Sequence, residues 1–133
     1  MRKKVLIVED NPATQKILVR MIHRIDQTAW VYGSTTAEAA FQTLKEATQE
    51  GEPFDVVVAD LNLPCSDGLT LKEVVEKKGW GPDFLFISGV TFEEWDRRSK
   101  IHGSMPPLLR KPITYLELKE YWDSRFSNVG ISS

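Results

Sequence analysis

The sequence predicts an α/β fold, in which a doubly wound, five-stranded parallel sheet carries helices on both faces. Five apolar runs, several rich in β-branched residues, alternate with segments of helical periodicity along the 133 residues. The run at residues 5–8 is continuously apolar and the run at 54–60 nearly so, which is typical of strands buried on both faces of a parallel sheet. Right-handed crossovers then place the helices on the two faces. The length suits a single domain of this kind.

The first strand and helix are predicted from residues 5–8 and the segment that follows them. Residues 5–8 read Val-Leu-Ile-Val and are followed by two acidic residues. Asn11 is suited to cap a helix, with Pro12 in its first position. Apolar residues then recur at helical spacing as far as Ile25.

The second strand is predicted at residues 30–32 and the second helix shortly after it. Thr35 and Glu38 have the spacing of a capping box, so we expect the helix to open at Thr35 and to continue to Ala47. Gly51 then marks its end.

The third strand is predicted at residues 54–60, a nearly continuous apolar run that ends at Asp60. Apolar residues at helical spacing from Leu71 predict a helix to Lys78. Gly79 and the glycine and proline after it end that helix.

Two further strands and helices complete the alternation. Strands are predicted at residues 84–87 and 108–111, with a short charged helix at 92–99 between them. We interpret Arg97 and Arg98 of that helix, together with Lys100 just after it, as a solvated face. Thr114 and Glu117 form a second capping box, which predicts a last helix after residue 113.

Composition excludes several classes of function. The net charge is −2 and the basic residues do not cluster, so the positive face of a nucleic-acid-binding domain is not expected. The apolar run near the N-terminus is too short for a signal sequence or a membrane span, which predicts a cytoplasmic protein. The single cysteine, Cys65, allows no internal disulfide.

Polar residues follow the predicted strands at their carboxyl ends. Glu9 and Asp10 follow the first strand, Asp60 ends the third, Ser88 follows the fourth and Lys111 ends the fifth. Ligands of open α/β sheets bind at this edge, so we expect these side chains to form one site. Three carboxylates so close together repel one another unless a cation is bound, and oxygen ligands of this kind suit Mg²⁺.

The same residues suit phosphoryl transfer. An ionised carboxylate such as Asp60 can attack phosphorus and form an acyl phosphate if charge on the transferred oxygens is neutralised. Lys111 is expected to pair with one phosphoryl oxygen, and the Ser88 hydroxyl to donate a hydrogen bond to another.

Four motifs in this order resemble those of the response regulator receiver domain of two-component signal transduction, in the CheY-like superfamily. They are Val8-Glu9-Asp10, the segment from Asp60 to Gly68, Ile87-Ser88-Gly89 and Arg110-Lys111-Pro112. The resemblance implies a flavodoxin-like (βα)5 fold with strand order 2-1-3-4-5. It covers residues 3 to about 126, so we expect a receiver domain over residues 1–126 and a short flexible tail over 127–133.

The resemblance also implies a function and a division of roles. Asp60 would be the phosphoacceptor of a phosphorelay and would become 4-aspartylphosphate, with a histidine kinase or a histidine phosphotransfer protein as donor. Mg²⁺ would be held by Asp10, Asp60 and the backbone carbonyl of Asn62, and Glu9 would act mainly through a water. Ser88 and Lys111 would sense the phosphoryl group. Such a domain is not a turnover enzyme, because it catalyses only its own phosphorylation and dephosphorylation.

Phosphorylation is expected to switch a partner-binding surface formed by the fourth helix, fifth strand and fifth helix. This surface would bind an output domain, an effector or a second copy of the chain. The domain itself is expected to bind neither a membrane nor nucleic acid directly. One residue departs from the family pattern, because Leu108 stands where an aromatic switch residue is usual. Asn62 and Val90 are expected to affect the lifetime of the acyl phosphate by flanking the path of the attacking water.

Three alternatives bear on this interpretation. A non-phosphorylated pseudo-receiver that serves as a docking module is favoured by Leu108 and opposed by the intact site. A haloacid-dehalogenase-like phosphatase is disfavoured because Pro12 stands where its second carboxylate is required, and no P-loop motif is present. The sequence leaves open whether the chain stands alone or is a part of a longer regulator or hybrid kinase.

Overall fold

A five-stranded parallel sheet forms the centre of the computed structural model, which describes residues 2–64, 66–102 and 107–126. The strands lie in the order β2-β1-β3-β6-β7. Their bounds are Lys4–Val8 for β1, Trp30–Ser34 for β2, Val56–Asp60 for β3, Asp83–Ser88 for β6 and Leu108–Arg110 for β7. Since β4 and β5 lie outside this sheet, the order matches the predicted 2-1-3-4-5, and the prediction is confirmed.

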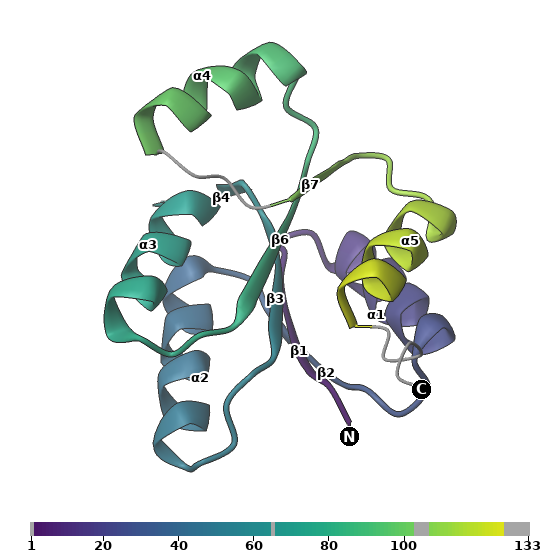
Figure 1. The fold of residues 1–133 in the computed structure, drawn as a ribbon, viewed down its shortest axis with the longest axis vertical. Helices are drawn as coiled ribbons and strands as arrows, with labels where there is room; N and C mark the ends of the chain where they lie inside the picture. The colour runs from purple at the N-terminus through teal and green to yellow at the C-terminus, as the bar shows by residue number, and fades with distance from the viewer. Residues whose placement is uncertain (1, 65, 103–106, 127–133) are drawn as a thin grey trace.

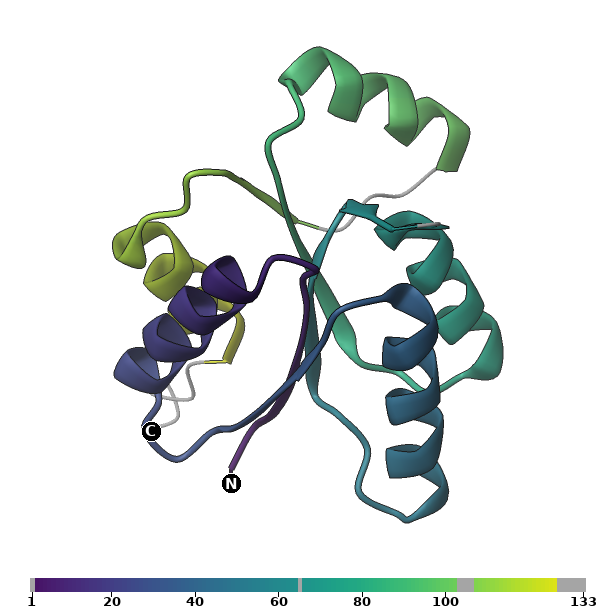
Figure 2. The ribbon, with the colours of Figure 1, turned by 180° about the vertical axis from the view of Figure 1, so that it is seen from behind.

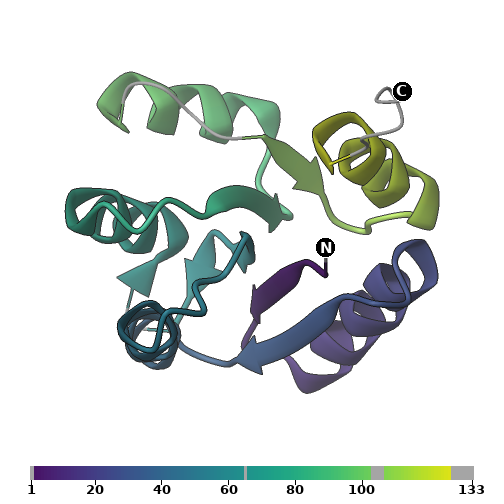
Figure 3. The ribbon, with the colours of Figure 1, turned by 60° about the horizontal axis from the view of Figure 1, so that its bottom comes forward.

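Helices cover both faces of the sheet, as predicted. The helices are α1 (Pro12–Ile25), α2 (Ala37–Gln49), α3 (Gly68–Lys78), α4 (Phe92–His102) and α5 (Tyr115–Phe126). Figures 1 and 2 show α1 and α5 on one face and α2 and α3 on the other. The helix α4 lies beyond the carboxyl ends of the strands, on the side of α3, as the view in Figure 3 also indicates.

The sheet divides the interior into two cores because successive side chains of a strand point to opposite faces. In β1, Leu6 and Val8 pack on the side of α2 and α3, whereas Val5 and Ile7 pack on the side of α1 and α5. All four side chains are fully buried, which confirms the prediction of a strand covered on both faces.

The predicted caps of the first and last helices are confirmed. The Asn11 side chain accepts a hydrogen bond from the Thr14 N–H, and Pro12 begins α1. At α5 the capping box is reciprocal, because the Thr114 N–H donates to Glu117 Oε1 (3.1 Å) and the Glu117 N–H donates to Thr114 Oγ1 (3.2 Å). Each pair satisfies backbone donors that the helix itself leaves without partners.

The predicted cap of the second helix is wrong by one residue. Thr36, and not Thr35, is the capping residue of α2, and its hydroxyl accepts from the Ala39 N–H at 3.1 Å. The reason lies in β2, which continues to Ser34 through its pairing with Val8 and so delays the start of the helix.

Several other boundaries differ from the predicted ones. The strand β3 begins at Val56 and not at residue 54, and α4 runs three residues beyond residue 99, to His102. The sequence did not predict a short antiparallel hairpin of β4 (Asn62–Leu63) and β5 (Ser66–Asp67), which follows Asp60 directly. The predicted tail, residues 127–133, lies outside the described residues. Among the described helices, none combines the length and apolar character needed to span a membrane.

Candidate functional site

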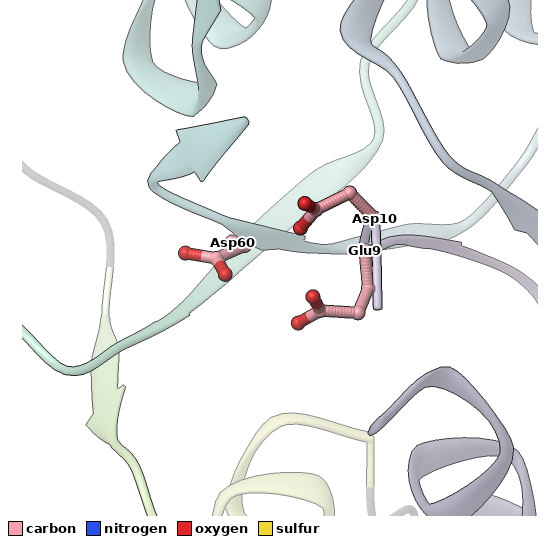
Figure 4. A group of neighbouring side chains, drawn as sticks. All are labelled: Glu9, Asp10 and Asp60. Carbon is pink, nitrogen blue, oxygen red and sulfur yellow. The ribbon is translucent and has the colours of Figure 1, made fainter. Parts of the chain in front are cut away.

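Three carboxylates meet at the carboxyl ends of two neighbouring strands. Glu9 and Asp10 follow β1, and Asp60 ends β3, which pairs with β1 so that Val8 lies opposite Ala59. One oxygen of each carboxylate lies within 4.8 Å of the others, and Figure 4 shows the three side chains side by side. Glu9 and Asp60 are buried, whereas Asp10 is exposed.

Lys111 bridges two of these carboxylates from the position directly after β7, which ends at Arg110 and not at the predicted residue 111. Its Nζ lies 2.8 Å from Asp60 Oδ2 and 2.9 Å from Glu9 Oε1. Partial burial lowers the pKa of the Lys111 amine, but hydrogen bonds and charge from Asp60 and Glu9 together outweigh that effect and raise the pKa above its ordinary value. The amine is therefore a cation at neutral pH, placed directly on the carboxylate of Asp60.

Ser88 lies at the end of β6, between the strands that carry Asp60 and Lys111. Its side chain is fully buried, and its hydroxyl oxygen accepts from the Val90 N–H at 3.2 Å. Its carbonyl accepts from the Lys111 N–H at 2.8 Å. The structure thus brings all the predicted side chains to one edge of the sheet.

The backbone after Asp60 is held by the carboxylate and by a glycine. The Asn62 N–H donates to Asp60 Oδ1 at 2.9 Å, and the Gly68 N–H donates to the Leu61 carbonyl at 2.8 Å. A Cβ at Gly68 would lie 2.7 Å from the Asp60 carbonyl oxygen and 2.7 Å from Phe86 Cε1, so only glycine fits there without displacement. This packing role of Gly68 was not predicted, although the Asp-Gly pair at the start of a helix could have indicated it.

The helix α4 reaches the same region through Arg98. Its Nη2 lies 3.4 Å from Asn62 Oδ1, and its Nη1 lies 3.8 Å from Asp67 Oδ2. Only 21% of the Arg98 side chain is exposed, so its assignment to a solvated face is wrong. Arg97 and Lys100 are exposed, as expected.

The donor set fits Mg²⁺ in chemistry and in charge. Every side-chain ligand offered by Glu9, Asp10 and Asp60 is a carboxylate oxygen, the kind that Mg²⁺ prefers. Three carboxylates against the Lys111 ammonium leave a net charge of −2 within this group, which a divalent cation would balance.

The chain resembles known signalling proteins over most of its length. The family model of the response regulator receiver domain matches residues 5–123. The two-component response regulator ARR11 of Arabidopsis thaliana is 34% identical over 121 residues, which are 90% of this chain and 22% of that protein. The hybrid signal transduction histidine kinase A of Dictyostelium discoideum is 31% identical over 123 residues, which are 90% of this chain and 5% of that protein. The chain therefore spans less than a quarter of the length of either relative.

Solved structures agree in fold at lower identity. The chemotaxis protein CheY4 of Vibrio cholerae superposes with a TM-score of 0.78 at 20% identity, over 95% of this chain and 100% of that one. A CheY-like receiver domain protein of Methanospirillum hungatei has a TM-score of 0.75 at 22% identity, over 94% of each chain. The chain accordingly belongs to the response regulator receiver domain family, the signalling domains of two-component phosphorelays.

Proposed function

We propose that this domain is a phosphoacceptor, in which Asp60 takes a phosphoryl group from a phosphohistidine of a histidine kinase or a histidine phosphotransfer protein in the cytoplasm. The observation that carries the proposal is the contact of 2.8 Å between Lys111 Nζ and Asp60 Oδ2 at the edge of the sheet. A carboxylate with a fixed cation beside it supplies both the nucleophile and part of the charge neutralisation that phosphoryl transfer requires.

The transfer is a displacement at phosphorus. A carboxylate oxygen of Asp60 attacks, the bond from phosphorus to the donor imidazole nitrogen breaks, and the electron pair stays on that nitrogen, which then takes a proton. Lys111 also contacts Glu9, at 2.9 Å, so it can release Asp60 Oδ2 and bind a phosphoryl oxygen while Glu9 keeps it in place. The Ser88 hydroxyl, on the adjacent strand, is suited to donate to another oxygen.

We assign the divalent site to Asp10, Asp60 and the backbone carbonyl of Asn62, with Glu9 acting indirectly. Both Glu9 oxygens have partners, Lys111 at 2.9 Å and the Asn11 N–H at 3.1 Å, and these support the indirect role if Glu9 keeps Lys111 when Asp60 is released. Bound Mg²⁺ supplies neutralisation of the charge on the phosphoryl oxygens.

A hollow beside the site is suited to the docking of a phosphodonor. It has a volume of about 410 Å³ and is lined mainly by α1 and by the segment after Lys111, including Ile17, Met21 and Pro112. Ile17 is 51% exposed, and Lys111 itself lines the hollow, so a helix seated there would bring its phosphohistidine close to Asp60. Ile17→Glu should leave labelling by acetyl phosphate unchanged and slow labelling by any histidine kinase that labels the parent. Equal slowing with both donors would contradict this assignment.

We further propose that phosphorylation acts on the surface formed by α4, β7 and α5. Ile101 of α4 is 75% exposed and Leu116 of α5 is 65% exposed, so this surface offers apolar side chains to an output domain, an effector or a second copy. Sedimentation of the protein with and without acetyl phosphate separates these cases. A second copy would raise the mass on phosphorylation, and Ile101→Glu should prevent that rise.

The central test is the intact mass after incubation with acetyl phosphate and Mg²⁺. We expect a gain of one phosphoryl group in the parent, and none in Asp60→Asn or in a sample without Mg²⁺. Asp55→Asn is the matched control, because Asp55 lies just before the opposite end of β3, where its side chain accepts from the Lys4 N–H. It should be labelled like the parent.

Two results of this labelling experiment would contradict the proposal. Undiminished labelling of Asp60→Asn would refute Asp60 as the acceptor. No labelling of the parent under conditions that label another receiver domain would favour the docking-module interpretation, for which Leu108 is the main support.

A further inference from the structure

Arg98 connects α4 to the segment that directly follows the phosphoacceptor. Its Nη2 lies 3.4 Å from Asn62 Oδ1, its Nη1 lies 3.8 Å from Asp67 Oδ2, and its Nε donates to Glu94 Oε2 at 3.1 Å. The guanidinium is largely buried between these three partners. A side chain held from three sides keeps its head group in one position, close to the hairpin of β4 and β5.

Asn62 lies between Arg98 and Asp60. Its backbone N–H donates to Asp60 Oδ1 at 2.9 Å, while its side chain faces the guanidinium. Because a guanidinium has only donors, the atom that faces Arg98 must be the amide oxygen of Asn62 and not its nitrogen. Arg98 therefore engages the only side-chain acceptor of a residue that also holds the phosphoacceptor.

That oxygen matters for the hydrolysis of an acyl phosphate. In hydrolysis, a water oxygen forms a bond to phosphorus, the bond from phosphorus to the Asp60 oxygen breaks with its electron pair returning to the carboxylate, and the water proton passes to solvent. A neighbouring amide oxygen can accept a hydrogen bond from the attacking water and orient it. An amide oxygen that already accepts a hydrogen bond from a guanidinium, here a long one of 3.4 Å, is less available for this task.

We propose that Arg98 is a positioning residue that prolongs the lifetime of phosphorylated Asp60, because it holds the Asn62 amide oxygen away from the attacking water. The inference rests on the proposed function, since it requires phosphorylation of Asp60. It goes further by assigning a role in the rate of signal decay to a residue of α4, far from Asp60 in the sequence.

The test is the decay of the phosphorylated form after removal of acetyl phosphate, followed by intact mass in Mg²⁺. Arg98→Ala should decay about two- to tenfold faster than the parent, the range expected when a single hydrogen bond of ordinary strength is lost. Asn62→Ala removes the amide oxygen altogether, so the double variant should decay at the same rate as Asn62→Ala alone. Arg97→Ala is the matched control, because Arg97 is the neighbouring arginine and pairs with Glu94 on the same helix.

A merely structural effect of Arg98 would give a different pattern. If Arg98→Ala acted by displacing α4, it would accelerate decay to the same extent in the Asn62→Ala background, and the emission of Trp95 on α4 would shift. That result would overturn the proposal, as would parental decay in Arg98→Ala. Absence of labelling in every variant, the parent included, would instead refute the proposed function, so the two failures are distinguishable.

Discussion

The helices α3 and α4 lie on the same side of the molecule but are held in different ways. The helix α3 buries Leu69, Leu71 and Val75, and it is closed at its ends by the Asp67 side chain and by Gly79 at φ 73°. No side chain of α4 that the structure describes is buried. Trp95 packs edge-on against Phe86, with 6.3 Å between ring centroids, and the remaining contacts to other elements include those of Arg98.

This difference in burial indicates that α3 supports the core, whereas α4 can be displaced more easily. Displacing α3 would expose apolar side chains to water, at about 25 cal/mol for each Å² exposed. Among the described side chains of α4, displacement would expose mainly parts of Trp95 and Arg98 and would break polar contacts that are partly solvated and individually contribute little. If Asp60 is phosphorylated as proposed, we therefore expect α4 to be able to shift without disturbing the core.

The largest effect that this comparison predicts is on stability. Leu71→Ala should lower the free energy of unfolding by about 2–5 kcal/mol, because it leaves a cavity in the core under α3. Ile101→Ala in α4 should change it by less than about 0.5 kcal/mol, since that side chain is 75% exposed. Urea unfolding measures both values, and equal losses would show that α4 is packed as firmly as α3.

A smaller loss in the free energy of unfolding is expected for a substitution at the start of α3. Gly68→Ala should cost about 1–3 kcal/mol, because its Cβ would meet the Asp60 carbonyl oxygen and the Phe86 ring, neither of which can move freely. Gly89→Ala is the control, since no atom lies within 4 Å of its Cβ position. Urea unfolding of the two variants should separate them, and a Gly68→Ala protein as stable as the Gly89→Ala protein would disprove the close packing.

The N-terminal cap of α3 is expected to contribute less to the free energy of unfolding than the close packing at Gly68. Asp67 accepts from the Thr70 N–H at 2.9 Å, so Asp67→Ala should cost about 1 kcal/mol, whereas Asp67→Asn keeps an acceptor in place and should lose little of that. Thermal unfolding of the two variants tests this. Equal melting temperatures would mean that the cap adds nothing to stability.

The smallest effect is spectroscopic and concerns α4. Phosphorylation with acetyl phosphate should shift the tryptophan emission of the parent, because the environment of Trp95 changes when α4 moves. Trp95→Phe should abolish the shift. Trp80→Phe should retain it, since Trp80 packs on Phe41 of α2. A shift that survives in Trp95→Phe would place the movement elsewhere.

The order of the elements and the members of the site were predictable because they depend on local patterns. Glu9 and Asp60 are the first polar residues after continuous or nearly continuous apolar runs, so both could be placed at carboxyl ends of strands without a structure. Lys111 follows Arg110 at the end of a short run and was placed there from the predicted strand 108–111. The capping box of Thr114 and Glu117 was predictable for the same reason, since both of its bonds are local.

The features that were missed depend on pairing between distant segments. The start of α2 at Ala37 follows from how far β2 pairs with β1, and the hairpin after Asp60 consists of strands of two residues, too short for any periodicity. The contact of Arg98 with Asn62 joins residues 36 apart, and a charged helix gives no sign of which basic residue turns inward.

The hydrogen bond from the Lys111 N–H to the Ser88 carbonyl links the carboxyl ends of β6 and β7. Ser88 and Arg110 are paired in register, so a displacement of either strand end is transmitted to the other. The chain segment that contains α4 leaves the sheet at Ser88 and returns to it at Leu108. Both ends of the segment that carries α4 are thus attached to these two paired strands, beside Ser88 and Lys111. We therefore expect a displacement of Ser88 or Lys111 to act on both ends of that segment together.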